Sequence, residues 1–317
     1  MNLYLNLFFM HHHPNPKISC FTFVLNDDQS KTLYEICRAR NFEPYDVNHA
    51  RYAFRANGFN LVMYHSGKLV LQGKEAADFV TFTIEPQITQ KFLLGNDNIF
   101  HPEWFTAHAG LDESGKGDFF GPIVTACVIA DGDKVRTLQN LGVKDSKQIS
   151  SDRTILAIEE KIREVPDIVI EVMTLSMAKY NELYGRFGNN LNQLLGWMHG
   201  CSLRNALKRR YVSEGILDQF SKSPIVQEFL KRDFPDFTLN MRIKAEDDPI
   251  VAAASIIARA EFIRRIEALS KEAQEPLPKG AGYKVKEMGR RIFEEKGAEA
   301  LAKYSKVHFK TFREICG

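Results

Sequence analysis

The stretch GLDESGKGDFFGP, residues 110–122, holds two sets of residues with opposite chemistry. Its glycines and lysine fit the G-x-x-x-x-G-K spacing of a phosphate-binding loop, in which backbone amides and a lysine surround a polyphosphate. That motif continues with Ser or Thr to hold Mg²⁺, whereas this sequence continues with Gly117. Asp112 and Glu113 would also repel an anion in the loop. The stretch therefore favours two carboxylates that hold metal over a loop that wraps phosphates.

Acidic residues lie where three apolar runs stop. Asp112 and Glu113 end the first run, Asp218 ends GILDQF, and Glu246 follows the apolar part of NMRIKAE. Residues at strand ends line the functional crevice of an α/β sheet, so we expect a cluster of four carboxylates. Carboxylates in a cluster raise one another's pKa values, and two divalent cations relieve that repulsion. A metal pair of this kind supports hydrolysis of a phosphodiester, and Mg²⁺ suits oxygen ligands.

Each acidic position also has a structural interpretation. Adjacent Asp and Glu residues are common on solvated surfaces. We assign Asp247 and Asp248, which precede Pro249, to capping of a helix with proline at its first position. We assign Asp118 to a turn. The joint placement of the four other acids, rather than any single one, supports a metal site.

The totals for the chain limit its class. With 317 residues, 44% hydrophobic and 26% charged, it is long enough for two globular domains. A formal net charge of +2 means that contact with nucleic acid depends on clustered charge. The five cysteines are scattered without C-x-x-C spacing, which favours reduced thiols in the cytoplasm. No apolar run approaches the ~18 residues of a membrane span, so we expect a cytoplasmic protein without a membrane partner.

The pattern along the chain predicts two domains. Residues 1–17 are predicted to be a tail that is disordered or non-native. Residues 18–94 show a strand, a helix and a hairpin meander with Asn-Gly and Ser-Gly turns, which predicts a small α+β domain. Residues 95–109 are turn-rich and are predicted to be a linker. From 110 to 317, strands alternate with helices, which predicts an α/β domain with a sheet flanked by helices.

The second half of the chain resembles ribonuclease HIII in an ordered series of motifs. The motifs are DESGKGDFFGPIVTACV (112–128), VKDSKQIS (143–150), NNLNQLLGWMH (189–199), ILDQF (216–220), KAEDDPIVAAASIIAR (244–259), LPKGAG (277–282) and VHFKTF (307–312). Each motif is short, but the ordered series is specific. The resemblance implies an RNase H fold and an endoribonuclease that cuts the RNA strand of RNA/DNA hybrids. It also implies two Mg²⁺ or Mn²⁺ ions per site, and 5′-phosphate and 3′-hydroxyl ends.

The resemblance also assigns roles to residues. The family's Asp-Glu-Asp-Glu set falls on Asp112, Glu113, Asp218 and Glu246 as catalytic metal ligands. Glutamate at the last position separates this chain from type II enzymes, which usually carry aspartate there. The segment GKLVLQGKEA (67–76) is similar to the family's substrate-binding domain, whose fold resembles the TATA-box-binding protein. The resemblance thus predicts an RNase H-like domain preceded by a small substrate-binding domain.

Five residues are candidates for contact with the substrate. Gly115, Lys116 and Gly117 depart from many type III enzymes and are closer to type II, where this stretch touches the ribose 2′-hydroxyl and the nearby backbone. Lys116 therefore raises the hypothesis of nicking at single ribonucleotides embedded in DNA. Lys68 and Lys74 are candidates for phosphate contact in the first domain, and solvated surface lysines are the alternative. We expect an RNA/DNA hybrid as the partner of a monomeric protein.

Two other classes of protein compete with this interpretation. One is a nucleic-acid-binding protein with an inactive nuclease half, and the other is a nucleotide hydrolase. The filled set of four acidic positions disfavours the first, and the poor phosphate loop disfavours the second. His199 and His308 lie within the motifs but are predicted to be structural, because a metal-activated water needs no histidine as its base.

Overall fold

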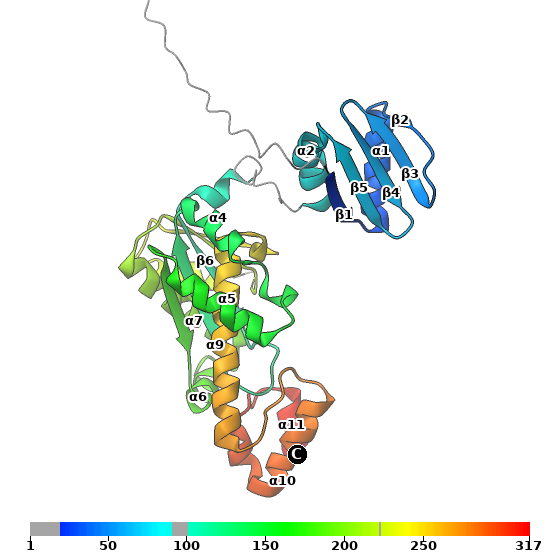
Figure 1. Cartoon of the computed structure of the whole chain (residues 1–317). Coiled ribbons are helices and arrows are strands. Elements are labelled where there is room, and N and C mark those ends of the chain that lie inside the picture. The colour runs from blue at the N-terminus through cyan, green and yellow to red at the C-terminus, as the bar shows by residue number, and fades with distance from the viewer. Residues whose placement is uncertain (1–19, 91–100, 222) are drawn as a thin grey trace, which may run out of the picture. The chain divides into compact units, whose positions relative to one another are not determined.

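The computed structural model describes residues 20–90, 101–221 and 223–317, and the chain divides into two compact units, Met1–His101 and Pro102–Gly317. Each unit has its own sheet and its own core (Figure 1). The predicted tail, residues 1–17, lies outside the described residues. An α+β unit followed by an α/β unit is the predicted fold class, and it is confirmed.

The first unit is an antiparallel meander with helices on one face. Its strands are β1 (Cys20–Val24), β2 (Glu43–Pro44), β3 (Ala50–Ala56), β4 (Phe59–Tyr64) and β5 (Lys68–Gly73), in the order β1-β5-β4-β3-β2. Its helices are α1 (Asp27–Ala39), α2 (Ala76–Phe79) and a π-helical segment, Val80–Thr89. Gly58 and Gly67 have φ values of +80° and +84°, which glycine adopts without strain, and they form the two predicted hairpin turns.

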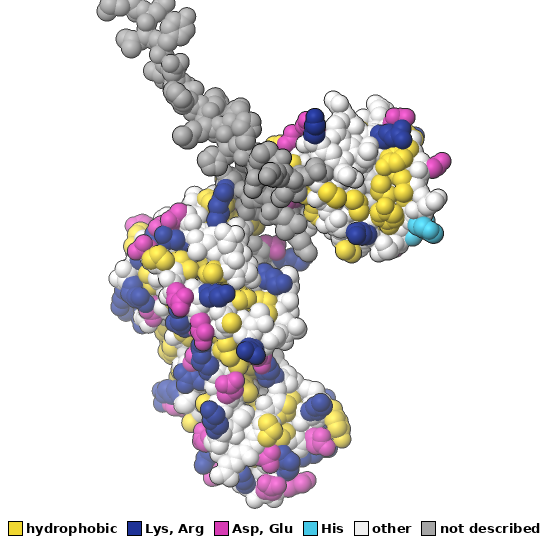
Figure 2. Space-filling model, viewed as in Figure 1, with side chains coloured by type: hydrophobic (Ala, Val, Ile, Leu, Met, Phe, Trp, Pro, Cys, Tyr) yellow, Lys and Arg dark blue, Asp and Glu magenta, His cyan; other side chains and the backbone are white. Residues whose placement is uncertain are grey.

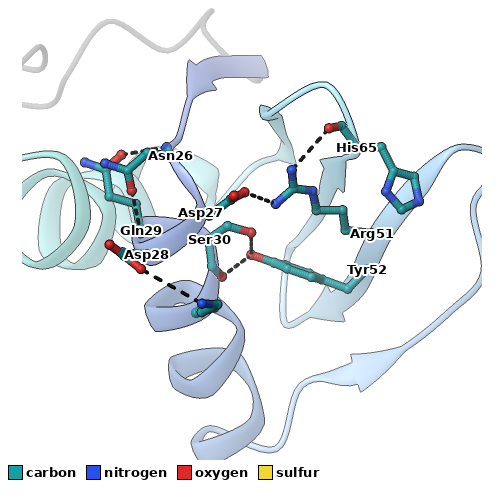
Figure 3. A network of polar contacts seen from close by, with 9 residues as sticks. Asn26, Asp27, Asp28, Gln29, Ser30, Arg51, Tyr52 and His65 are labelled. Carbon is teal, nitrogen blue, oxygen red and sulfur yellow. Dashed lines mark hydrogen bonds and ion pairs between the residues drawn. The ribbon is translucent and has the colours of Figure 1, made fainter.

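The N-terminus of α1 is fixed by a capping box (Figure 3). Asn26 Oδ1 accepts a hydrogen bond from Gln29 N at 2.9 Å, and Gln29 Oε1 accepts one from Asn26 N at 3.0 Å. The capping acids expected here, Asp27 and Asp28, instead occupy the first turn, where they face the positive end of the helix dipole. Arg51 on β3 donates to Asp27 Oδ1 at 2.5 Å and so ties the helix to the sheet.

The alternation of side chains along the strands leaves one face of this sheet open. Leu61 and Met63 on β4 and Leu71 on β5 are fully buried against the helices. Lys68 and Gln72 have the opposite parity on β5 and are exposed. A band of hydrophobic side chains is visible on the surface of this unit (Figure 2). The first unit thus offers a sheet face that its own helices do not cover.

The second unit is built on a mixed sheet. Its strands are β6 (His108–Ser114), β7 (Val124–Ala130), β8 (Val169–Thr174), β9 (Glu214–Asp218) and β10 (Thr238–Arg242), in the order β10-β9-β6-β7-β8. The strands β6, β9 and β10 run parallel, and β6, β7 and β8 pair antiparallel. Parallel neighbours bring their carboxyl ends to one edge of the sheet, which matters for the acidic residues.

Helices cover both faces of this mixed sheet. They are α4 (Gly132–Asn140), α5 (Asp152–Glu164), α6 (Met177–Arg186), α7 (Leu191–Arg209), α8 (Ile225–Leu230), α9 (Pro249–Ala273), α10 (Tyr283–Ala302) and α11 (Lys310–Cys316). Val124 and Ala126 of β7 pack into a core with α4, α5 and α9, whereas Cys127 and Ile129 pack into a core with α7 and α8. Figure 1 shows α10 and α11 beside the C-terminal end of α9.

The start of α9 lies unusually close to β6. Asp248 caps the helix, accepting hydrogen bonds from Ile250 N and Val251 N, and Pro249 occupies the first turn, as predicted. Asp247 does not cap it and lies in a short 3-10 turn instead. A Cβ atom at Gly110 would meet Val251 N at 2.5 Å, so only glycine allows this approach. The helix that follows Glu246 is thereby pressed against the strand that carries Asp112.

The second unit begins earlier than the predicted boundary at residue 110. Part of the predicted linker, residues 95–100, lies outside the described residues. The rest contains a 3-10 helix, Pro102–Phe105, and the first two residues of β6. His108 is buried, with Nε2 3.2 Å from Asp248 Oδ1, so a polar residue that suggested a loop is satisfied inside the strand.

Candidate functional site

The parallel pairing of β6 and β9 brings two of the predicted acids together. Leu111 on β6 is opposite Leu217 on β9, and the next residue on each strand is Asp112 and Asp218 respectively. Both side chains therefore lie at the carboxyl edge of the sheet. This edge is where ligands bind to open α/β sheets.

Glu246 reaches the same edge from a turn rather than from a strand. The strand β10 ends at Arg242, and Glu246 lies in a 3-10 turn, Ala245–Asp247, that leads into α9. The expectation of a strand end was therefore wrong at this position, because Lys244 takes a left-handed conformation, with φ +58°, and breaks the strand. Ala245 N donates to Asp218 Oδ1 at 3.2 Å, which fastens the turn to the end of β9.

Asp112 is a buried carboxyl group, with an exposed fraction of 5%. Burial, followed by the negative charge of Glu113, raises its pKa to about 7, while the Ser255 hydroxyl, the Glu113 N–H and Lys147 act in the opposite direction. Glu113 N donates to Asp112 Oδ1 at 2.8 Å. In the metal-free protein this group is therefore partly protonated near neutral pH.

Glu113 is also buried but has partners for both of its oxygens. His199 Nε2 lies 3.1 Å from Oε2, and Lys116 Nζ lies 3.5 Å from Oε1. Burial alone would raise the pKa of Glu113, but the hydrogen bond and charge of His199, together with Lys116, lower it below its ordinary value. Two adjacent carboxyl groups thus have pKa values shifted in opposite directions.

Lys147 faces three of the four acids. Its Nζ lies 3.7 Å from Glu246 Oε1. Burial would lower the pKa of Lys147, but the negative charges of Glu246, Asp112 and Asp218 contribute to raising it above its ordinary value. One ammonium group that is influenced by acids from β6, β9 and the turn before α9 shows that these acids surround a common region.

The segment that carries Lys147 is held against α9. Ser146 Oγ and Ser255 Oγ are 2.7 Å apart, and Arg259 donates to the backbone oxygen of Ser146. Lys147 and His199 were not predicted as site residues, although both lie in motifs that carry the family resemblance. The DSK pattern was the available signal for Lys147. For His199, the sequence held no signal that its ring faces Glu113.

The four acids fit divalent cations on chemical grounds. All of their donors are carboxylate oxygens, the ligands that Mg²⁺ and Mn²⁺ prefer. Glu246 Oε2 is buried and has no hydrogen-bond partner, which leaves a costly orphan that a cation would satisfy. Within residues 20–90, 101–221 and 223–317, no three acidic, histidine or cysteine side chains are already gathered as a metal cage. Repulsion among the acids, with Lys116 and Lys147 held between them, accounts for this spacing.

The Gly115-Lys116-Gly117 stretch follows directly on β6. Gly115 has φ +85°, and a Cβ atom there would lie 2.5 Å from Pro122 O. Gly117 has open space around its Cα atom. Lys116 Nζ lies over the Phe220 ring, 5.8 Å from its centroid. The first glycine is therefore required by the fold, and the second leaves room for a ligand backbone.

The end of this loop is clamped by the C-terminal part of the chain. Lys306 is fully buried, and its ammonium donates to Asp118 O at 2.6 Å and to Gly121 O. Burial lowers the pKa of Lys306 to about 7. Asp118 Oδ1 accepts from Gly280 N at 2.5 Å, so Asp118 has a structural role, as predicted.

The other candidates for substrate contact, Lys68 and Lys74, lie in the first unit. Lys68 is at the start of β5 on the open face of the sheet. Lys74 follows β5 and lines a cavity of about 520 Å³ together with Arg40, Phe79 and Phe82. Over the visible face of the second unit, Lys and Arg are interspersed with Asp and Glu (Figure 2). No broad basic field is visible on that face.

Comparison with known proteins decides the family. The model of the Ribonuclease HII family matches residues 109–312. The chain is 41% identical over 272 residues to Ribonuclease HIII of Protochlamydia amoebophila, covering 85% of this chain and 87% of that protein. It is 39% identical over 300 residues to Ribonuclease HIII of Chlamydia pneumoniae, covering 93% and 98%. The chain belongs to the ribonuclease HIII family. It is therefore an enzyme of the ribonuclease H class, and the resemblance of the motifs is confirmed.

Solved structures agree with this assignment to the ribonuclease HIII family. Bst-RNase HIII, solved in complex with Mn²⁺, superposes with a TM-score of 0.63 at 28% identity, over 94% of this chain and 98% of that chain. The ribonuclease H2 of Pyrococcus horikoshii covers 67% of this chain with a TM-score of 0.58, and at 24% identity it shares the fold. None of the described helices is long and apolar enough to cross a bilayer.

Proposed function

We propose that the protein hydrolyses the RNA strand of RNA/DNA hybrids with two divalent ions, leaving 5′-phosphate and 3′-hydroxyl ends. The convergence of Asp112, Asp218 and Glu246 around Lys147 carries this proposal, because it gathers acids from three separate elements at one sheet edge. Membership of the ribonuclease HIII family supports the substrate class. Free cysteines support a reducing cytoplasm as its location, and we expect it to act as a monomer.

Asp112, Glu113, Asp218 and Glu246 are the proposed ligands. When bound, Mg²⁺ or Mn²⁺ supplies Lewis acidity that activates a water and neutralises the departing 3′-oxygen. The protein's own groups prepare for that chemistry: His199 and Lys116 hold Glu113 ionised, and Asp112 gives up its proton at the cost of a raised pKa. Bst-RNase HIII was solved with Mn²⁺, which supports the same class of cofactor here.

The substrate is recognised by shape rather than by base sequence. A hybrid offers phosphates and 2′-hydroxyls, and the open space at Gly117 permits a nucleic-acid backbone to approach the acids. We assign the open sheet face of the first unit, including Lys68, to contact with the hybrid backbone. Lys74 is the weaker candidate of the two, because it lines a side cavity rather than the sheet face.

A cleavage assay tests the principal proposal. The protein should cut a hybrid in Mg²⁺ or Mn²⁺, and should leave double-stranded DNA and double-stranded RNA intact. Asp112→Asn should abolish cleavage and retain hybrid binding, since a metal ligand is lost and the binding surface is not. Undiminished cleavage by this variant would refute the ligand assignment. Hybrid binding with no cleavage by the wild-type protein in either metal would favour a non-catalytic binding protein.

Lys116 supports a second activity, nicking at a single ribonucleotide embedded in DNA. Its ammonium lies beside Glu113 and over Phe220, next to the space at Gly117, where a ribose can approach. The test is a duplex with one ribonucleotide, assayed separately in Mg²⁺ and Mn²⁺ beside the full hybrid. Lys116→Ala should reduce nicking at the single ribonucleotide more than cleavage of the hybrid. Absence of nicking in both metals would remove this activity.

A further inference from the structure

His199 is a polar residue in a place that packing alone does not explain. It lies on α7, is fully buried, and its Nδ1 has no hydrogen-bond partner. Its ring stacks on Phe220 at 5.4 Å between centroids and 19° between planes. Its single side-chain hydrogen bond among the described residues joins Nε2 to Glu113 Oε2 at 3.1 Å. A buried residue with one polar contact and one orphaned atom serves the group that it contacts.

The chemistry of the contact fixes the direction of the hydrogen bond. An ionised carboxylate only accepts, so the imidazole Nε2 carries the proton and donates to Glu113. A second proton at Nδ1 would be buried without an acceptor, which is more costly than an unpaired lone pair at that atom. The ring is therefore a fixed donor, and the flat Phe220 ring beneath it limits its rotation.

This donor leaves the two oxygens of Glu113 with different tasks. His199 holds Oε2, whereas Oε1 is approached by Lys116, whose side chain is 39% exposed and long enough to move away. The same Phe220 ring lies beneath both the imidazole and the ammonium. The carboxylate is thus anchored on one side by a rigid, buried group and bordered on the other by a mobile, exposed one.

We propose that His199 is a positioning residue that anchors Glu113 through Oε2, so that Oε1 is presented to a divalent cation when Lys116 withdraws. The proposal rests on the assignment of Glu113 as a metal ligand. Without the anchor, the flexible glutamate side chain loses rotamer freedom each time it binds a cation, and the affinity falls. Groups that hold a metal ligand by hydrogen bonding typically contribute about 10- to 100-fold to metal affinity.

Calorimetric titration of the full-length protein with Mn²⁺ tests this role. His199→Leu keeps an apolar side chain of similar size and removes the donor, and should weaken Mn²⁺ binding about 10- to 100-fold. His199→Gln places an amide N–H at the position of Nε2 and should restore most of the affinity. His199→Asn is too short to reach Glu113 and should behave like His199→Leu. The Gln and Asn pair decides the matter if His199→Leu does not fold.

The matched control is Met198→Ala, which disturbs packing at the neighbouring position of α7. Met198 belongs to a separate apolar cluster with Ile123 and Tyr180, so its loss should lower stability and leave Mn²⁺ affinity unchanged. The KM for a hybrid should also stay unchanged in His199→Leu, because His199 lies behind Glu113 and is fully buried.

Two results would overturn the proposal. One is equal Mn²⁺ affinity of the wild-type protein and His199→Leu, and the other is equal affinity of the Gln and Asn variants. Failure of the proposed function would appear differently, as a wild-type protein that binds Mn²⁺ but cuts no hybrid. In that case the ranking of the four Mn²⁺ affinities still decides the role of His199.

Discussion

Lys147 Nζ lies 3.7 Å from Glu246 Oε1, although the two residues come from opposite ends of the catalytic sequence. The contact exists because Ser146 and Arg259 fasten the Lys147 segment to α9, the helix that follows Glu246. A cation is thereby held at the mouth of an acidic cluster. When divalent ions occupy the acids, that ammonium is placed to attract the phosphate of the substrate.

Replacing Lys147 should separate stability from activity. The Lys147 side chain is 68% exposed, so Lys147→Ala should change the free energy of unfolding by less than about 0.5 kcal/mol. Hybrid cleavage at saturating metal should slow about 10-fold or more, because a positive charge beside the phosphate is lost. Single-turnover kinetics measure this effect. The control is Lys144→Ala on the same segment, and equal rates for the two variants would contradict the assignment.

Asp112 should make the metal-free protein less stable as the pH rises. Its folded pKa of about 7 exceeds the ordinary value of 3.8, so between these pH values the folded state keeps a proton that the unfolded chain releases. Stability is therefore lost as the pH rises from about 4 to about 7. Asp112→Asn removes this loss and should be more stable than wild type at pH 8, by at most about 4 kcal/mol.

Urea unfolding with a chelator present, at pH 5 and pH 8, measures this difference. The advantage of Asp112→Asn should be larger at pH 8. A constant difference between the two proteins at both pH values would show that Asp112 ionises in the folded state as it does in the unfolded chain. Addition of Mn²⁺ should reverse the order, because only the wild type retains the full ligand set.

Gly115 and Gly117 should respond differently to alanine. Gly115→Ala forces a left-handed residue and a Cβ contact of 2.5 Å with Pro122 O, and should destabilise the protein by about 2 kcal/mol or more. Gly117→Ala meets open space and should change stability by less than about 0.5 kcal/mol. Gly117→Ala should nevertheless raise the KM for the hybrid, because the methyl group occupies the approach of the substrate. Thermal unfolding and steady-state kinetics test the pair, and an unchanged KM would exclude substrate contact at Gly117.

Lys306 should contribute most to stability at high pH. Burial lowers its folded pKa to about 7, so between about pH 7 and 10 the unfolded chain binds a proton that the folded state does not. Wild-type stability therefore rises with pH in that window. Lys306→Met leaves Asp118 O and Gly121 O unpaired and should cost roughly 1 to 3 kcal/mol. Chemical unfolding at pH 6.5 and pH 9 should show the larger loss at pH 9, and the reverse order would contradict the buried ammonium.

The sequence alone determined the two-unit organisation, the class of each sheet and the family. Period-2 alternation and glycine turns predicted the meander from Ala50 to Gly73, because these signals act between neighbours in the chain. Acids at the ends of apolar runs marked Asp112 and Asp218 as residues of one sheet edge. The linker was drawn too far into the second unit, because His108 looked polar and its buried partner Asp248 is remote in sequence.

Only the tertiary structure decided which groups meet around the acids. Glu246 lies in a turn because Lys244 breaks the strand, and a hydrogen bond from Ala245 to Asp218 fixes that turn. His199 faces Glu113 because α7 packs on the sheet with that side chain inward, and Lys147 faces Glu246 because its segment docks on α9. These contacts depend on packing between elements distant in the chain, which no local pattern encodes.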